Sequence, residues 1–175
     1  MLRMRPYKPC DAKYIAGWIT EERLFYQWSA GKMGEYPLTE EMLKAHCGQY
    51  DDSDSFWGMT ALDGEGVPRG WMIMRFLDQQ KRDLRFGFIV VDPAMRGKGY
   101  GKEMLLLAQR YAFDILKADR VSLGVFANNP KAMYCYQAAG LTEKQGGRKT
   151  GPISMTSGEE MWECIEMERR RDGIE

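Results

Sequence analysis

The stretch of residues 84–116 constrains the fold most, because it contains the pattern of a buried strand, a glycine-rich turn and a long helix in direct succession. Residues 86–91 are β-branched, aromatic or glycine, which is typical of a strand buried on both faces. Pro93 ends this strand, because proline has no N–H for a ladder. The helix is indicated by apolar residues at i, i+3 and i+4 spacing, namely Met104, Leu107, Ala108, Tyr111 and Ile115.

The turn at residues 96–102, Arg-Gly-Lys-Gly-Tyr-Gly-Lys, has the features of an anion site. Its alternating glycines allow the backbone to curl and to approach a ligand without Cβ clashes. The helix that follows directs unpaired N–H groups and the positive end of its dipole at the turn. Arg96, Lys98 and Lys102 add formal charge. The turn is therefore predicted to bind a phosphate or a pyrophosphate.

Two familiar phosphate-binding patterns do not fit this turn. The Walker pattern has four residues between its glycines and ends in Lys-Ser/Thr, and the dinucleotide fingerprint is G-x-G-x-x-G. A solvated glycine-rich turn without a ligand is the structural alternative. The R-G-x-G-x-G spacing after V-x-P instead resembles the signature of the GNAT N-acetyltransferase superfamily, in which the turn holds the pyrophosphate of acetyl-coenzyme A (acetyl-CoA).

A second segment strengthens the resemblance. Residues 129–141, Asn-Pro-Lys-Ala-Met-Tyr-Cys-Tyr-Gln-Ala-Ala-Gly-Leu, are similar to the family pattern N-x-x-A-(I/M)-x-x-Y-x-x-x-G-(F/L). The resemblance implies one N-acetyltransferase domain over residues 1–175, with an α/β fold whose mixed, mostly antiparallel sheet is flanked by helices. It implies transfer of an acetyl group from acetyl-CoA to a primary amine of a small molecule or a protein N-terminus, by direct attack in a ternary complex.

The resemblance also implies roles for single residues. The main-chain groups of Ile89, Val90 and Val91 would bind the pantetheine arm like an added strand. Asn129 would contact the pantetheine or the helix start, and Tyr136 would protonate the leaving thiolate. The pyrophosphate would be held by Arg96, Gly97, Lys98, Gly99, Tyr100, Gly101 and Lys102.

Tyr136 suits the role of an acid, because a phenol with a pKa near 10 is protonated at neutral pH. Its structural interpretation is core packing on the same helix face as Met133. The base is less clear, since the central strand lacks the glutamate that many relatives carry there. A water chain could serve instead, or a loop carboxylate such as Glu35.

Composition excludes several classes. Lys plus Arg and Asp plus Glu number 25 each, which argues against a general nucleic-acid or membrane-surface binder. No stretch has transmembrane length and no apolar signal core opens the chain, so a cytoplasmic location is expected. The four scattered cysteines suggest neither a metal site nor a disulfide framework. His46, the single histidine, is interpreted as an ordinary helix residue.

The remaining patterns give an order of elements. Strands are expected at residues 1–8, 56–62, 67–77, 84–91, 120–126 and 162–168, and helices at 10–18, 21–28, 39–50, about 100–116 and 131–139. The 84–91 and 120–126 strands should pair in parallel, because a crossover helix separates them. Residues 145–160 are expected to be a mobile loop and 169–175 a frayed tail.

The sequence leaves several alternatives for the acceptor amine and for the oligomeric state. Residues 25–36 are either a loop that packs its rings into the core or, with 145–160, a wall of the acceptor site. The resemblance is loosely closest to relatives that acetylate ribosomal-protein N-termini, polyamines or aminoglycosides. An acidic pocket would favour polycations and an open groove a peptide. A monomer or a homodimer is expected, and a non-catalytic CoA-binding regulatory module is the alternative function.

Overall fold

Seven strands form one mixed sheet in the order β1-β2-β3-β4-β5-β7-β6 in the computed structural model of the protein, which describes residues 1–173. Neighbouring strands are antiparallel, except that β4 and β5 run in parallel. The predicted mixed, mostly antiparallel sheet is confirmed. The strands are β1 (Arg3–Pro6), β2 (Phe56–Leu62), β3 (Pro68–Phe76), β4 (Asp83–Val91), β5 (Arg120–Phe126), β6 (Thr142–Met155) and β7 (Gly158–Arg170).

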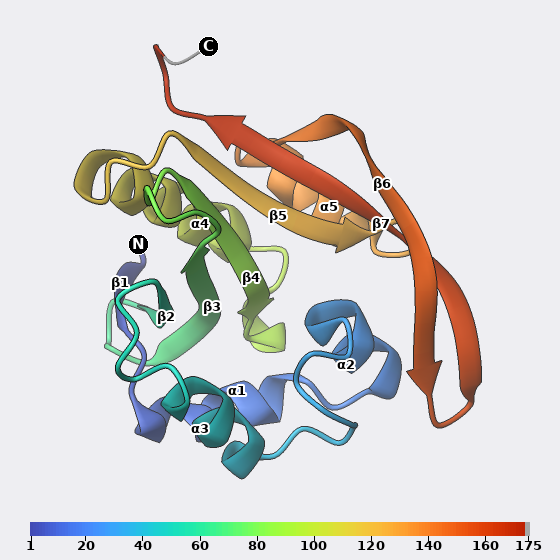
Figure 1. The fold of residues 1–175 in the computed structure, drawn as a ribbon. Helices are drawn as coiled ribbons and strands as arrows, with labels where there is room; N and C mark the ends of the chain where they lie inside the picture. The colour runs from blue at the N-terminus through green and yellow to red at the C-terminus, as the bar shows by residue number, and fades with distance from the viewer. Residues whose placement is uncertain (174–175) are drawn as a thin grey trace.

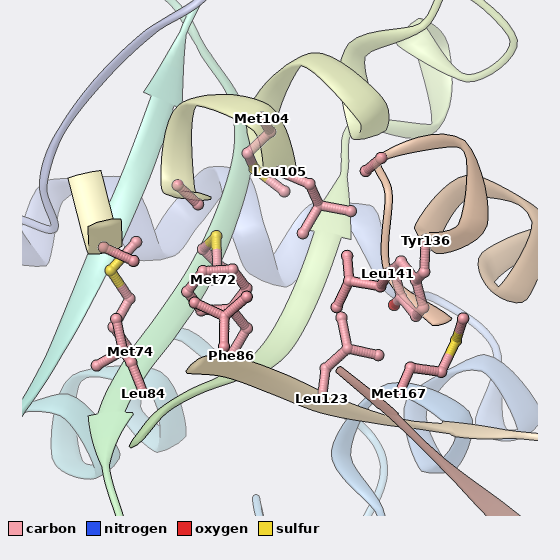
Figure 2. Close-up of a cluster of buried hydrophobic side chains, with 14 of the residues drawn as sticks. Met72, Met74, Leu84, Phe86, Met104, Leu105, Leu123, Tyr136, Leu141 and Met167 are labelled. Carbon is pink, nitrogen blue, oxygen red and sulfur yellow. The ribbon is translucent and has the colours of Figure 1, made fainter. Parts of the chain in front are cut away.

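Helices cover both faces of the sheet (Figure 1). On one face lie α1 (Ala12–Trp18), α2 (Glu22–Ser29) and α3 (Glu40–Gly48), and on the other lie α4 (Tyr100–Arg110) and α5 (Pro130–Ala138). Side chains along β3 alternate between the two layers, because successive residues of a strand point to opposite faces. Met72 and Met74 pack in the core beneath α4 and α5, which Figure 2 shows, whereas Trp71 and Ile73 pack in the core beneath α1–α3.

A β-bulge interrupts β4 at its centre. The register with β3 shifts between Trp71 and Ile73, which pair with Val90 and Gly87, so β4 has one extra residue there. Phe88 has a φ of +49°, a backbone conformation that β-branched and aromatic residues seldom adopt. One extra residue inverts the facing of the strand. Phe86 accordingly packs in the α4/α5 core and Val90 in the α1–α3 core.

Beyond a short paired stretch, β4 and β5 diverge (Figure 1). Their ladder joins only Asp83–Arg85 to Arg120–Ser122. β5 continues instead with β7, as far as the pair of Phe126 with Cys164. The facing edges of β4 after Arg85 and of β5 after Ser122 are therefore free of each other. We call the space between them the strand opening.

An ion pair that crosses β5 lies where the strands part. Arg85 of β4 reaches Glu166 of β7, with 3.2 Å between Nη2 and Oε2 and a second, shorter contact between Nη1 and Oε1. The path runs over Gly124 of β5, where an added Cβ would lie 3.0 Å from Arg85 Nη2. Glycine at this position thus lets one side chain link three strands.

Most predicted helices and strands are confirmed, including the first residues of two helices. Thr39 Oγ1 accepts from Met42 N at 3.2 Å, and Asn129 Oδ1 accepts from Ala132 N at 3.3 Å, so both are N-caps. None of the helices in residues 1–173 is long and apolar enough to cross a membrane.

Three local predictions were wrong. Residues 145–160 are not a loop but the distal part of the β6–β7 hairpin, which lies beside α2 through an ion pair of Arg23 with Glu160. The long helix reaches its predicted end, but its last part, Tyr111–Ile115, is a π-helix, and Ile115, predicted to lie on the apolar face, is 67% exposed. Arg169 and Arg170 belong to β7 rather than to a frayed tail, while residues 174–175 of that tail lie outside the described residues.

Candidate active site

The glycine-rich turn follows β4 through a fixed connection. Arg69 of β3 binds Asp92 at 2.8 Å, which holds the end of β4 before a 3₁₀ turn at Pro93–Met95. Gly97 and Gly99 then have φ angles of +76° and +81°, and α4 begins directly after them. These left-handed conformations explain the two glycines.

The cations of the turn lie free at the start of α4. Arg96, Lys98 and Lys102 are exposed and form no ion pair within residues 1–173. They lie in sequence beside the unpaired N–H groups of the first helical turn, and nothing lies within 4 Å of a Cβ placed on Gly97 or Gly99. The turn can therefore receive an anion without rearrangement of neighbouring side chains.

Gly101 lies where α4 packs on α5. A Cβ on Gly101 would lie 2.9 Å from Cys135 Sγ of α5, so this glycine allows close packing of α4 on α5. We predict that Gly101→Ala lowers the free energy of unfolding by about 1–3 kcal/mol, as overpacking does. In a Cys135→Ala background the same change should be neutral or stabilising, because the clash is gone and alanine favours helix. Chemical denaturation of the four proteins checks this; equal losses in both backgrounds would contradict it.

The open edge of β4 presents main-chain acceptors. Asp92 N donates to Arg69 O at 2.8 Å, toward β3. The N–H and C=O of one trans peptide point in opposite directions, so the Val91 carbonyl faces the strand opening. The Val90 carbonyl lies on the β3 side, 3.4 Å from a Cβ placed on Gly70. Alternation then returns the Ile89 carbonyl to the opening.

Tyr136 lies on α5 at the expected position and is 8% exposed (Figure 2). Its ring packs in the α4/α5 core with Leu123 and Leu141. Burial, with a smaller contribution from neighbouring Cys135, raises the pKa of the phenol above its ordinary value of 10.0. The core-packing interpretation thus describes part of its environment, and the raised pKa keeps the phenol protonated at neutral pH.

A cavity of about 460 Å³ lies at the strand opening, on the α2 and α3 side of the sheet. Its walls come from α2 and the residues after it, from α3 and Tyr50 after it, and from the five strands β2, β3, β4, β5 and β7. Aromatic and apolar side chains dominate, including Trp28, Phe56, Ile73, Phe88 and Phe126. Residues 25–36 contribute both to the core and to the cavity wall, since Phe25 and Tyr26 are buried in the core while Trp28 and Lys32 line the cavity, whereas no residue of 145–160 lines it.

The charged lining of the cavity consists of Lys32, Arg75 and Arg85. No carboxylate lines it within the described part of the chain, and Glu35 is not in its wall. An acidic pocket was expected to favour a polycationic acceptor and an open groove a peptide. The cavity is neither of these. Nor does any group of three or more potential metal-ligating side chains occur among residues 1–173.

Several lining residues were not predicted from the sequence. His46 is one of them: it packs edge-to-face on Phe88, and its Nε2 is buried without a hydrogen-bond partner among the described residues. Burial lowers the pKa of His46, which keeps its imidazole neutral at pH 7. The position of Arg75 beside Arg85 could have been predicted, because an antiparallel pairing of the consecutive 67–77 and 84–91 strands makes the two residues cross-strand partners.

The model of the acetyltransferase (GNAT) family matches residues 17–141. The chain belongs to the GNAT family. It is 34% identical to a spermidine N(1)-acetyltransferase of Vibrio cholerae over 143 residues, which are 82% of this chain and 80% of that protein. It is 33% identical to an uncharacterized N-acetyltransferase of Bacillus subtilis over 93 residues, 53% of this chain and 58% of the other.

Solved structures show the same fold. The crystal structure of spermidine N-acetyltransferase from Vibrio cholerae in complex with CoA and spermine superimposes with a TM-score of 0.80 at 20% identity, covering 97% of this chain and 95% of the other. The GNAT fold is thus confirmed. This GNAT enzyme is an acetyltransferase that uses acetyl-CoA and transfers the acetyl group to an amine. The expected enzymatic activity is supported over the non-catalytic alternative.

Proposed function

We propose that this GNAT enzyme acetylates a primary amine of a small molecule, by direct attack on acetyl-CoA held in the strand opening. One observation carries the proposal: the 460 Å³ cavity adjoins the free edge of β4, so an acceptor in the cavity would meet a cofactor bound along that edge. The volume is in the range typical of small-molecule sites.

The cofactor would bind along β4 and the turn. The free N–H groups at the start of α4 and the side chains of Arg96, Lys98 and Lys102 would hold the pyrophosphate. The carbonyls of Ile89 and Val91 would accept hydrogen bonds from the pantetheine amides, as a neighbouring strand does. Asn129 would act mainly through the start of α5, which it caps. In this way the thioester would reach the bulge at Phe88.

The chemistry then needs two proton movements. The neutral amine attacks the thioester carbonyl carbon, an N–C bond forms, the C–S bond breaks, and the nitrogen releases its proton to solvent. Tyr136 would donate its phenolic proton to the departing thiolate and recover one from water. The products are the N-acetylated amine and free CoA.

Direct attack is supported by the state of the nearby thiols. Cys164 lines the cavity, and Cys135 packs beside the turn. Burial raises the pKa of both thiols, so each is held mainly in the poorly nucleophilic protonated form at neutral pH. An acyl-cysteine intermediate is thereby disfavoured.

Two further expectations accompany this function. The four cysteines are all unpaired, in keeping with a reducing cytoplasm. A monomer or a homodimer is expected, and light scattering of the purified protein would decide between them.

Initial-rate kinetics test the proposed function. With acetyl-CoA and a panel of small primary amines, CoA release should depend on the amine, and double-reciprocal plots should intersect. Cys164→Ala should retain turnover, because that thiol forms no acyl intermediate. Parallel plots together with loss of activity in Cys164→Ala would contradict direct attack. Acetyl-CoA binding without turnover of any amine would contradict the proposed function.

A further inference from the structure

We infer that the acceptor carries an anionic group, a carboxylate or a phosphate, in addition to the amine that is acetylated, and that Lys32 and Arg75 bind this group. The inference rests on the proposed function and specifies its substrate class. It predicts that polyamines, which carry only positive charge, are poor acceptors for this chain.

The charge of the cavity is the first argument. Its charged lining is wholly basic, and Lys32 and Arg75 have no ion-pair partner within residues 1–173. A polycation brought into this cavity would meet like charges and no carboxylate to offset its lost hydration. An anion would meet two cations without an ion-pair partner, in a wall of aromatic, apolar and uncharged polar side chains and the paired Arg85.

The pairing of Arg75 with Arg85 is the second argument. These two residues are direct cross-strand partners on β3 and β4, and like charges in such a position destabilise a sheet. Glu166 offsets the charge of Arg85, whereas Arg75 has no ion-pair partner within residues 1–173 and keeps the part of the repulsion that remains. An unfavourable local arrangement that borders a cavity indicates a functional site, because a bound anion would relieve it.

These cations are too far from the turn to serve the cofactor pyrophosphate. Arg75 pairs with Arg85 and Gly70 pairs with Val91, so Arg75 is five residues from the end of β4 along β3, which is about 17 Å at roughly 3.3 Å per residue. Lys32 lies instead close enough to Cys164, beneath the opening, to contribute to lowering the pKa of its thiol, although burial outweighs this effect. The basic lining therefore represents a second anion site, next to the position of the thioester.

The same charges would assist deprotonation of the acceptor. An ammonium group close to cations has a lowered pKa, so more of the amine is neutral and nucleophilic. β4 lacks the glutamate expected of a strand base, and the positive field would supply part of what that base does. The anionic group would anchor the substrate, while the field would favour the reactive form of its amine.

Matched pairs of amines test the inference. L-phenylalanine is compared with L-phenylalaninamide, and O-phosphoethanolamine with ethanolamine, with spermidine as the polycation; kcat/KM is expressed per neutral amine. In at least one pair the anionic member should be favoured about tenfold or more, as charge-assisted hydrogen bonds provide. The pair that responds distinguishes a carboxylate from a phosphate site.

Two substitutions test whether Lys32 and Arg75 cause the preference for the anionic amine. Arg75→Gln and Lys32→Gln should each remove most of it by raising the KM of the anionic amine. The neutral partner should lose only the smaller effect of the field on its amine, and the KM of acetyl-CoA should stay unchanged. Arg75→Gln should remain folded, because it removes a like-charge contact. Arg110→Gln, an exposed charge deletion on α4, is the matched control and should leave the preference intact.

The outcomes separate this inference from the proposed function. Turnover of spermidine and the neutral amines above the anionic ones, with no response to Arg75→Gln, would overturn the inference and leave acetyl transfer standing. If no amine turns over, the proposed function fails, and calorimetry on the CoA-bound protein still tests the pocket. Equal affinity for N-acetyl-L-phenylalanine and its amide would then overturn the anion site.

Discussion

Tyr136→Phe is expected to lower kcat by about 10²–10⁴-fold, the usual value of a positioned acid, while acetyl-CoA affinity stays nearly unchanged. The ring is retained, so its packing against Leu123 and Leu141 in the α4/α5 core is preserved. Only the proton for the thiolate is lost. Single-turnover CoA release, which isolates the chemical step, is the measurement.

Tyr134 offers a matched control on the same helix. It is 75% exposed and precedes Tyr136 by two residues, so Tyr134→Phe removes a phenol that faces solvent. This variant should turn over at the wild-type rate. If Tyr136→Phe, shown to be folded by circular dichroism, did so as well, Tyr136 would be a core residue and the thiolate would take its proton from water.

The pH profile gives the same hypothesis a second readout. Burial raises the pKa of Tyr136, and a group with a raised pKa keeps its proton to higher pH. The kcat of the wild-type enzyme should therefore show no fall from this phenol up to about pH 10. A fall centred well below pH 9 that disappears in Tyr136→Phe would mean that cofactor binding reverses the effect of burial.

Gly99→Asp is expected to weaken acetyl-CoA binding at least tenfold. The position is open, so the new carboxylate would stand beside the pyrophosphate without steric hindrance. Two unit charges about 6 Å apart repel by roughly 2.8 kcal/mol at an effective dielectric constant of 20, which corresponds to about 100-fold in affinity. Isothermal calorimetry with acetyl-CoA measures the loss.

Gly146→Asp controls for backbone strain and added charge. Gly146 also has a left-handed φ, +70° against +81° for Gly99, and nothing lies within 4 Å of its Cβ position. It lies on β6, an edge strand that β5 and β7 separate from β4 and so from the turn that follows β4. Equal affinities of the two folded variants would remove the pyrophosphate from this turn.

The turn and α5 were predictable because their signals are local. A left-handed residue before a helix requires glycine, and Asn129 caps α5 through an atom three residues away in the chain. Such constraints are visible in a short window of sequence. The parallel pairing of β4 with β5 followed from the crossover helix between them.

The β6–β7 hairpin was missed because its signal is not local. Residues 145–160 are rich in glycine and polar side chains and look like a loop. They form strands because they pair with each other, and because contacts of Arg23 with Glu160 and of Glu22 with Thr156 N hold the hairpin against α2. Strand propensity depends on such neighbours.

The cavity could also not be predicted from the sequence. Lys32 follows α2, His46 lies on α3 and Arg75 on β3, and the fold alone brings these side chains to one space. The bulge at Phe88 was missed although Gly87 directly precedes it, since a glycine within a strand pattern is a signal for a bulge. Helix and strand boundaries can thus be predicted from local sequence, whereas the proposed acceptor site forms only when distant elements pack together.

Through the strand opening, the folding stability of the protein would depend on the concentration of acetyl-CoA. The facing edges of β4 and β5 lack backbone partners beyond Arg85 and Ser122, and a pantetheine arm bound as proposed would complete the sheet there. A ligand that binds only the folded state adds about 2.7 kcal/mol to its stability at a concentration of 100 Kd. When acetyl-CoA runs short, the population that lacks it would unfold more often and expose free strand edges to proteases and to other chains. The amount of enzyme in a cell would then follow the abundance of its own donor, without any regulator.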